Sequence, residues 1–344
     1  MTVDISTVPR VRITLLPTPL VELRRLSDAL QGPRIFMKRD DLTGLALGGN
    51  KTRKLEFLLG EALSQGCDAV ITVGAVQSNH CRQTAAAAAA VGVECHLVLG
   101  GEKPAFPPGN LLLDYLCGAT VHYCAEPERE HEVLEIAERL RSRGRKPYVI
   151  PFGGSNAVGA MGFVAAVSEL KDQMAALDKR VDHVVLPSSS GGTHAGMTVG
   201  VDLYDLSMNV IGIGIDRGEP GEPSYESELA ILANQIAEKL GTPSRYTASD
   251  FHMRYGYLGE GYGVVGDLER EAIQLVANHE GILLDPVYTG RAMGGLIDMV
   301  RNNELTVSDT VVFWHTGGLP AVFDYTRELI PGRSGGSTRQ VGRV

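Results

Sequence analysis

The sequence has few of the residues that build metal centres or disulfide frameworks. Among 344 residues there are nine histidines, one tryptophan and five cysteines. The cysteines form no C-x-x-C pair and no group with histidine at the spacing of metal ligands. They are Cys67, Cys81, Cys95, Cys117 and Cys124. The sequence therefore predicts no metal site, and unpaired thiols favour the reducing environment of the cytoplasm.

Basic residues and long apolar runs are also scarce. Lysine and arginine number 32 against 41 acidic residues, which gives a formal charge of -9. Such a field repels nucleic acids and anionic membranes, so neither is an expected partner. The first twenty residues, MTVDISTVPRVRITLLPTPL, contain acids and prolines and predict neither a signal peptide nor a membrane span. A small molecule is the expected partner.

Short apolar runs that alternate with helical patterns are, by contrast, abundant. The run AVITVGA (69–75) precedes an alanine-rich helical stretch, and ECHLVLG (94–100) follows that stretch. This alternation is typical of βαβ units in a parallel sheet. A chain of this length has room for about two domains. We therefore predict an α/β protein with two domains and a cleft between them.

The alternation breaks at GGSNAVGAMGF (153–163), where a second series of strands and helices begins. We expect a small domain over 53–164 and a large domain made of 1–52 together with 165–330. The segment 331–344, PGRSGGSTRQVGRV, has few apolar residues and is expected to form a flexible tail.

A lysine follows two glycines in GGNKTRKLE (48–56). Glycines allow the backbone to approach a flat ligand, and the cations Lys51, Arg53 and Lys54 raise the local positive potential. Lys51 is therefore a candidate amine nucleophile. A helix start with three solvated cations explains the same pattern, and these nine residues alone do not separate the two interpretations.

Two further loops connect a strand to a helix and carry hydrogen-bond donors. QSNH (77–80) follows AVITVGA, and a helix N-terminus there would bind a carboxylate. SSSGGTHAG (188–196) follows the run HVVLP and looks like a phosphate cradle, although it lacks the lysine of a Walker A loop. Simple N-capping explains both loops equally well. His80 is either an acid that faces the substrate or a surface histidine.

Two loops near the end of the chain contain further candidates. LLDPVYTG (283–290) places Tyr288 and Thr289 after an expected buried strand, and HTGG (315–318) follows another strand. A tyrosine there could transfer protons or stack on a ring, and Thr289 could bond a heteroaromatic nitrogen. A buried tyrosine with one structural hydrogen bond and a simple turn are the alternatives.

Together these segments resemble one family, the fold type II pyridoxal-phosphate enzymes related to 1-aminocyclopropane-1-carboxylate (ACC) deaminase and D-cysteine desulfhydrase. The likeness runs from about residue 10 to residue 325. The motifs that carry it are KRDDLTG, GGNKTRKLEF, QSNHCRQTAA, PYVIPFGGSNAVGAMGF, SSSGGTHAGM, EGILLDPVYTGRAMGGL and HTGGLPA. The resemblance implies a tryptophan synthase β-like fold with parallel-rich sheets flanked by helices. It also implies a homodimer and pyridoxal 5'-phosphate as the cofactor.

The resemblance further implies a role for each candidate. Lys51 would form the Schiff base with the cofactor and shuttle the substrate's α-proton. Asn79 would bond the phenolic oxygen of the cofactor, and Thr289 would face its pyridine nitrogen. The other implied cofactor-binding residues are Lys54, Ser190, Gly191, Gly192, Thr193 and Thr316. The implied substrate-binding residues are Ser78, Asn79, His80 and Tyr288, with Ser78 and Tyr288 also in catalysis.

The sequence departs from the deaminases at three of these positions. They carry glutamate, leucine and glutamine where this chain has Thr289, Thr316 and His80. A carboxylate keeps the pyridine nitrogen protonated, and a neutral threonine does so far less, which disfavours opening of a cyclopropane ring. We therefore expect β-elimination, foremost the conversion of D-cysteine to hydrogen sulfide, pyruvate and ammonia. The alternatives are L-cysteate sulfo-lyase, ACC deaminase, a β-replacement synthase and a catalytically silent cofactor-binding protein.

Overall fold

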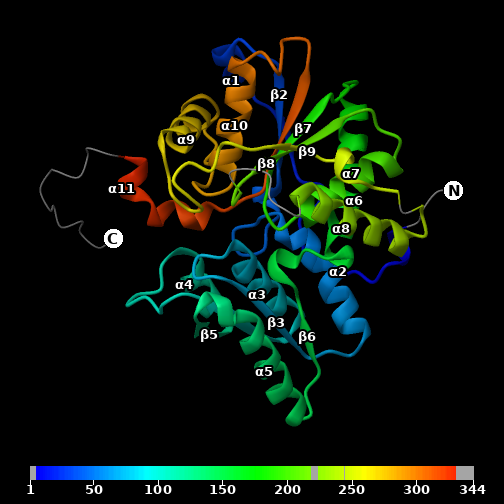
Figure 1. Cartoon of the computed structure of the whole chain (residues 1–344), viewed down its shortest axis with the longest axis vertical. Coiled ribbons are helices and arrows are strands. Elements are labelled where there is room, and N and C mark those ends of the chain that lie inside the picture. The colour runs from blue at the N-terminus through cyan, green and yellow to red at the C-terminus, as the bar shows by residue number, and fades with distance from the viewer. Residues whose placement is uncertain (1–4, 218–223, 244, 331–344) are drawn as a thin grey trace, which may run out of the picture.

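A computed structural model describes residues 5–217, 224–243 and 245–330 and contains two separate sheets (Figure 1). The larger sheet has the strand order β1-β2-β10-β7-β8-β9. Its strands are β1 (Leu20–Glu22), β2 (Arg34–Arg39), β10 (Thr310–His315), β7 (His183–Ser188), β8 (Asn209–Gly214) and β9 (His252–Arg254). Only the β1–β2 pair of this sheet is antiparallel.

The smaller sheet is parallel throughout and has the order β5-β4-β3-β6. Its strands are β3 (Ala69–Ala75), β4 (Glu94–Gly100), β5 (Thr120–Cys124) and β6 (Pro147–Val149). The helices between them are α3 (Asn79–Val91), α4 (Gly109–Leu116) and α5 (Arg129–Ser142). The predicted α/β class with parallel-rich sheets is thus confirmed. The predicted tail over 331–344 lies outside the described residues.

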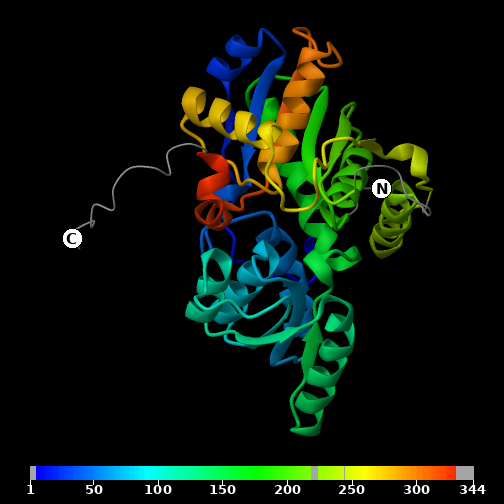
Figure 2. The same ribbon diagram turned by 60° about the vertical axis from the view of Figure 1, so that its left-hand side comes forward.

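Two helices lie where the two sheets meet, α2 (Lys51–Ser64) and α6 (Ala157–Ala176). The others pack around the larger sheet, as Figures 1 and 2 show. They are α1 (Arg24–Leu30), α7 (Gly192–Leu203), α8 (Tyr225–Leu240), α9 (Asp267–Glu280), α10 (Thr289–Arg301) and α11 (Thr326–Leu329). In the part of the chain with assigned structure, no helix is both long and apolar enough to traverse a bilayer.

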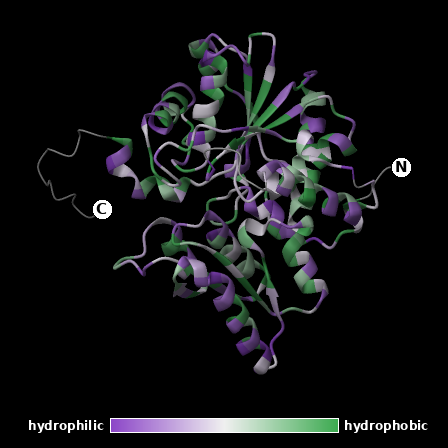
Figure 3. Cartoon of the chain, in the orientation of Figure 1, coloured by the Kyte–Doolittle hydropathy of each residue, from purple (hydrophilic) through white to green (hydrophobic). Residues whose placement is uncertain are grey.

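The strands of both sheets are mostly hydrophobic, and the outer helices turn hydrophilic residues outward (Figure 3). Leu97, Val98 and Leu99 of β4 are all fully buried. Such a continuous apolar run, rather than an alternating one, is what a parallel strand covered on both faces requires. The apolar runs in the sequence therefore indicate that helices cover both faces of each sheet.

Helix α6 begins inside the glycine-rich segment 153–163, where the alternation of strands and helices breaks. Asn156 caps it by accepting a hydrogen bond from the Gly159 amide at 2.9 Å. A Cβ at Gly162 would lie 2.3 Å from the Arg53 carbonyl oxygen of α2, so only glycine permits this helix contact. These glycines serve close packing rather than helix termination, which is why the pattern is misleading there.

The prediction of a strand before Asp285 is wrong. Residues 281–285 have no strand partner in the described structure, and Asp285 instead begins a turn that leads directly into α10. The short strands β1 and β9 were not expected. Three residues with no alternation give no periodic signal, so their pairing depends on the neighbouring strand rather than on local sequence.

A buried ion cluster fixes the start of α2 against the larger sheet. Arg53 donates to both carboxylate oxygens of Asp40 at 2.8 Å and to Glu169 at 2.9 and 3.0 Å. Lys38 donates to Glu169 as well, and the Trp314 indole donates to Asp40 at 2.8 Å. Burial alone would raise the pKa of Glu169, but Arg53 and Lys38 outweigh it and lower the pKa to about 2.

Glu169→Gln is expected to destabilise the protein by about 3 kcal/mol at pH 7, because it leaves two buried cations with one carboxylate. The pKa of Glu169 is lower in the folded chain than its ordinary 4.5. Its contribution is therefore complete above about pH 5 and disappears as the pH falls towards 2. Urea unfolding at pH 7 and pH 3 measures the free energy of unfolding. The difference in this free energy between Glu169→Gln and wild type should be smaller at pH 3. Glu138→Gln, at an exposed position, is the matched control; an equal loss in both variants would contradict the role of the cluster.

Candidate active site

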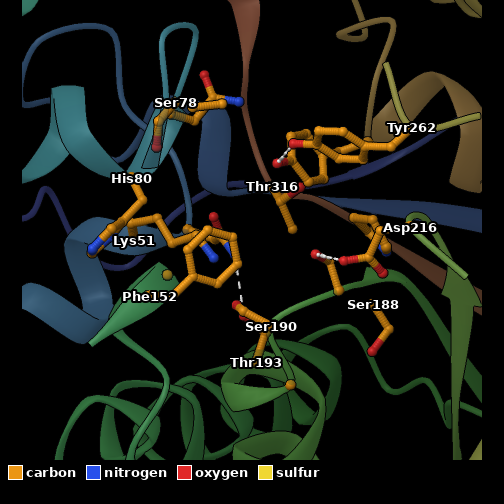
Figure 4. A pocket seen from close by; sticks show the side chains of 18 of the residues that line it. Lys51, Ser78, His80, Phe152, Ser188, Ser190, Thr193, Asp216, Tyr262 and Thr316 are labelled. Carbon is orange, nitrogen blue, oxygen red and sulfur yellow. Dashed lines mark hydrogen bonds between the residues drawn. The ribbon is translucent and has the colours of Figure 1, made fainter. Parts of the chain in front are cut away.

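A cavity of about 240 Å³ lies between the two sheets. Figure 4 shows Lys51, Ser78 and His80 on one side of it and Tyr262 and Asp216 on the other. Of the twelve predicted site residues, nine line the cavity: Lys51, Ser78, Asn79, His80, Ser190, Gly191, Thr193, Tyr288 and Thr316. Segments far apart in the sequence thus meet at the carboxyl ends of strands of both sheets, as open α/β sheets generally arrange their ligand sites.

Lys51 is the first residue of α2 and follows two glycines with positive φ angles, 66° at Gly48 and 129° at Gly49. A Cβ at Gly48 would lie 2.2 Å from the Asp41 carbonyl oxygen, so this turn requires glycine. The turn directs Lys51 into the cavity, where burial lowers the pKa of its amine to about 8. About a tenth of Lys51 is therefore unprotonated and nucleophilic at pH 7, far more than for a solvated lysine.

Lys54 lies one helical turn further along α2 and is fully buried. Its Nζ donates to the Gly153 carbonyl at 3.1 Å and to the Ser155 hydroxyl at 3.0 Å. Burial, and then the charge of Lys51, lower its pKa well below the usual value. Throughout the described ranges no carboxylate lies within 4 Å of either amine. The site therefore has two buried amines and lacks an anion to pair with them.

Glycines let the donors of the loop 190–193 and of residues 153–155 come close to Lys54. A Cβ at Gly192 would lie 2.7 Å from Ser155 Oγ and 3.0 Å from Lys54 Nζ. One at Gly153, where φ is 63°, would lie 2.4 Å from Ser190 Oγ. The loop ends in the N-terminus of α7, where unpaired backbone N–H groups favour an anion. The donors and the space fit a phosphate group, and the aldehyde-reactive Lys51 lies next to them.

The turn after β3 places Ser78 as the N-cap of α3, and its hydroxyl oxygen accepts the Cys81 amide at 3.1 Å. The capping interpretation of Ser78 is therefore correct, and the residue also lines the cavity. The hydroxyl proton is not used by the cap. Its partner within the described chain is the buried Cys81 thiol, a weak acceptor, so a ligand oxygen can take this donor instead.

His80 is not a surface residue but is buried against β3. Its Nε2 lies 2.8 Å from Thr72 Oγ1, and the Thr72 hydroxyl donates its own proton to the Ile150 carbonyl at 2.9 Å. Nε2 must therefore carry the proton, and Nδ1 is a buried acceptor with no partner among the described residues. Burial, and then the charges of Lys51 and Lys54, lower the pKa of His80 well below its usual value. At neutral pH His80 is thus an uncharged ring rather than an acid.

Tyr288 precedes α10, and its hydroxyl forms a hydrogen bond with that of Tyr262. The two rings meet edge to face with centroids 6.1 Å apart. Burial, and then the proximity of Tyr262, raise the pKa of Tyr288 well above its usual value, so the phenol keeps its proton at neutral pH. Tyr262 comes from the loop 255–266, where no periodic pattern identified it.

The structure does not bring Thr289 to the cavity wall. Its side chain is fully buried, and its hydroxyl donates to Asp285 Oδ1 at 2.7 Å while accepting the Asp285 amide at 2.8 Å. Thr316 does line the cavity. Its loop is held by His315, whose Nε2 donates to the Leu283 carbonyl at 3.0 Å and whose Nδ1 accepts the Gly317 amide at 3.2 Å.

Several lining residues were missed by sequence reasoning: Arg129, Phe152, Asp216 and Tyr262. Arg129 begins α5, and the sequence of this helix is typical of a charged surface helix. Phe152 and Gly153 belong to a segment treated only as a break between domains. Asp216 accepts a hydrogen bond from the Ser189 hydroxyl at 2.8 Å, and nothing local in the sequence marks it.

The family model described as pyridoxal-phosphate dependent enzyme matches residues 11–317. The chain belongs to this family. It is 42% identical over 326 residues to a D-cysteine desulfhydrase of Salmonella choleraesuis (strain SC-B67), covering 92% of this chain and 96% of the relative. The D-cysteine desulfhydrase of Salmonella typhi is also 42% identical with the same coverage. A crystal structure of an ACC deaminase homologue superposes with a TM-score of 0.85 at 39% identity, covering 94% of this chain and 96% of that one.

The predicted family, fold type and cofactor are confirmed: the protein is a pyridoxal-phosphate-dependent enzyme of the ACC deaminase and D-cysteine desulfhydrase group. The site agrees with this cofactor on its own evidence. Two buried amines without a carboxylate partner and a glycine-lined space at a helix N-terminus together suit a phosphorylated aldehyde.

Proposed function

We propose that this enzyme is a D-cysteine desulfhydrase, a carbon–sulfur lyase that releases hydrogen sulfide, pyruvate and ammonia. The observation that carries the proposal is the 42% identity to D-cysteine desulfhydrases across 96% of their length. The family match over residues 11–317 includes every segment that lines the cavity. Thr316 and Thr289 stand where the deaminases carry leucine and glutamate, and without the carboxylate of that glutamate beside the cofactor elimination is favoured over opening of a cyclopropane ring.

Lys51 and Lys54 divide the work of holding the cofactor in this proposal. Lys51 Nζ would hold its aldehyde carbon covalently, and Lys54 with the loop Ser190–Thr193 would hold its phosphate. When bound, the cofactor supplies an electron sink for the charge that develops on the substrate's α-carbon. Once the substrate's amine displaces Lys51 from that carbon, the released Nζ would remove and return the α-proton, for which an amine with a lowered pKa is suited.

The substrate carboxylate would bind Ser78 Oγ and the free amides at the start of α3, where the helix dipole favours an anion. Tyr288 would lie beside the leaving sulfur. Its phenol remains protonated at neutral pH, so it donates a hydrogen bond to sulfide as charge collects there. Tyr262 holds that hydroxyl in place. His80 would form an uncharged wall beside the substrate.

We further propose that residues 53–164 and residues 1–52 with 165–330 act as two domains that enclose the substrate. The separate sheets of the two segments support this division. We also propose that the enzyme is a cytoplasmic homodimer. Five cysteines without a disulfide are in keeping with the reducing cytoplasm. Light scattering of the purified enzyme tests the dimer.

A substrate panel tests the function. Pyruvate formation should be fastest with D-cysteine among D-cysteine, L-cysteine, L-cysteate, β-chloro-D-alanine and D-serine, and 2-oxobutyrate should not form from ACC. A preference for L-cysteate with release of sulfite would replace the proposal by a sulfo-lyase. Consumption of a second thiol would indicate a β-replacement synthase. No product from any amino acid would leave a silent cofactor-binding protein.

The lowered pKa of Lys51 predicts how cofactor attachment to the apoenzyme depends on pH. Below about pH 8 the amine is mostly protonated and lacks a lone pair, so the attachment rate should rise about tenfold from pH 6 to pH 7. It should level off above about pH 8. Growth of the visible absorption band after mixing apoenzyme with cofactor measures the rate. A midpoint near pH 10, as for a solvated lysine, would contradict the burial of this amine.

A further inference from the structure

We infer that Arg82 and Asn110 fix the side-chain amide of Asn79 so that its NH2 group, and not its oxygen, faces the cavity. Neither Arg82 nor Asn110 lines the cavity. They would act as positioning residues, with Asn110 one hydrogen bond and Arg82 two hydrogen bonds away from Asn79. The inference rests on the proposed function, in which Asn79 bonds the phenolic oxygen of the cofactor.

The direction of each hydrogen bond follows from chemistry, beginning at Arg82. Its guanidinium is fully buried and can only donate, and Nε lies 2.7 Å from Asn110 Oδ1. The oxygen of the Asn110 amide therefore faces Arg82, and its nitrogen faces the opposite way. That nitrogen lies 3.0 Å from the backbone carbonyl oxygen of Gln77, which can only accept. Two independent partners thus give the same orientation of Asn110.

The orientation of Asn79 follows from that of Asn110. Asn110 Nδ2 also donates to Asn79 Oδ1 at 3.0 Å, so the oxygen of Asn79 is turned away from the ligand side. Asn79 Nδ2 makes no hydrogen bond to any residue that the structure describes, and Asn79 lines the cavity. A donor is therefore presented to the ligand, and it suits an oxygen that is negatively charged or accepts hydrogen bonds.

The surroundings keep the relay rigid. Asn110 is fully buried, and its backbone amide donates to Gln77 Oε1 at 2.9 Å. Arg82 Nη1 donates to the carbonyl of Ala46, in the segment that leads to Lys51. The same guanidinium therefore fixes the amide that would face one side of the cofactor and the backbone that leads to its lysine. Because the site is buried, a reversed amide at Asn79 would place its oxygen against the ligand oxygen.

The test uses the cofactor-loaded enzyme and two readouts other than turnover, the dissociation constant of the cofactor and the pH dependence of its visible absorption. Asn110→Asp keeps the shape and the partner of Arg82 but replaces the donor toward Asn79 by an acceptor. We expect the Asn79 amide to rotate, with a loss of cofactor affinity of about tenfold or more and a shift in the absorption midpoint. Arg82→Met should cause a similar change, and Arg82→Lys, which retains a buried donor, should recover most of it.

A double-mutant cycle separates the relay from a general structural effect. In an Asn79→Ala background there is no amide to orient, so Asn110→Asp should change neither readout further. Wild-type affinity and absorption in both Asn110→Asp and Arg82→Met, or effects that add fully to Asn79→Ala, would overturn the inference. If Asn110→Asp does not fold, the cycle is run with Arg82→Met. Failure of the proposed function looks different, because the wild-type enzyme itself would then bind no cofactor or release no pyruvate.

Discussion

Lys51→Ala is expected to abolish both turnover and the visible absorption of covalently bound cofactor. Lys51 is the amine at the cavity wall with a pKa near neutrality, and the deeper Lys54 is held by the Gly153 carbonyl and Ser155. Pyruvate release from D-cysteine should fall by at least about a thousandfold, since the variant loses both the covalent bond and the base for the α-proton. Absorption spectroscopy and a lactate dehydrogenase-coupled assay measure the two effects.

Lys179→Ala is the matched control, because it removes the same side chain from an exposed position, where that side chain makes no hydrogen bond or ion pair in the described structure. It should leave both signals at the wild-type level. The phosphate site of Lys51→Ala should persist, so the cofactor should still bind without a covalent bond and dialyse away. A yellow and active Lys51→Ala enzyme would refute the assignment of this lysine.

Asp285→Ala is expected to cause the largest loss of stability. Asp285 is fully buried and accepts hydrogen bonds from the amides of Val287, Tyr288 and Thr289 and from the Thr289 hydroxyl, at 2.7–3.0 Å. Its removal leaves three buried backbone donors at the start of α10 without a partner, and the Thr289 hydroxyl keeps only its 3.4 Å hydrogen bond to the backbone carbonyl of residue 285. Each orphaned donor costs about 1–3 kcal/mol, so the free energy of unfolding should fall by about 4 kcal/mol or more. Urea unfolding measures this loss.

Asp285→Asn should lose about half as much free energy of unfolding, because the amide keeps one acceptor oxygen. Asp267→Ala, at an exposed position on α9, should show no measurable change. Since Tyr288 begins the same turn, we also expect Asp285→Asn to lower kcat for D-cysteine at a saturating cofactor concentration. Equal stability of Asp285→Ala and Asp267→Ala would show that water replaces the carboxylate without cost.

The parts of the site that sequence reasoning could find are those whose local pattern and chemistry coincide. Lys51 follows a glycine turn and begins a helix, so its direction is set within four residues. Ser78 is both a helix cap and a cavity residue, which explains why QSNH is open to a structural and a functional interpretation. The phosphate loop is likewise a strand, a glycine turn and a helix start in sequence order.

The parts that could not be found depend on partners distant in sequence. Ser155 completes the space beside Gly192 from a position 37 residues away. Tyr262 meets Tyr288 across 26 residues, from a loop without periodicity. Thr289 is a different case: its residue type suits a ring nitrogen, and four residues upstream lies Asp285, which takes its hydroxyl proton in the structure. Side-chain chemistry alone does not tell which acceptor a hydroxyl selects when both lie nearby.

The first turn of α2 has a consequence for how length variation can be tolerated. Each residue of a helix turns the direction of its side chain by about 100°. Lys51 therefore points toward the cavity, Arg53 toward the acids of the larger sheet and Lys54 toward the glycine-lined space. Inserting one residue between Gly49 and Arg53 would rotate the whole set and direct the guanidinium away from Asp40 and Glu169. The loop 101–108 leads to α4 over the surface, and its residues need no fixed rotation about a helix axis. In a library of insertion and deletion variants selected for activity, changes at 101–108 should therefore be retained. Changes between 49 and 54 should be lost, whatever residue is inserted.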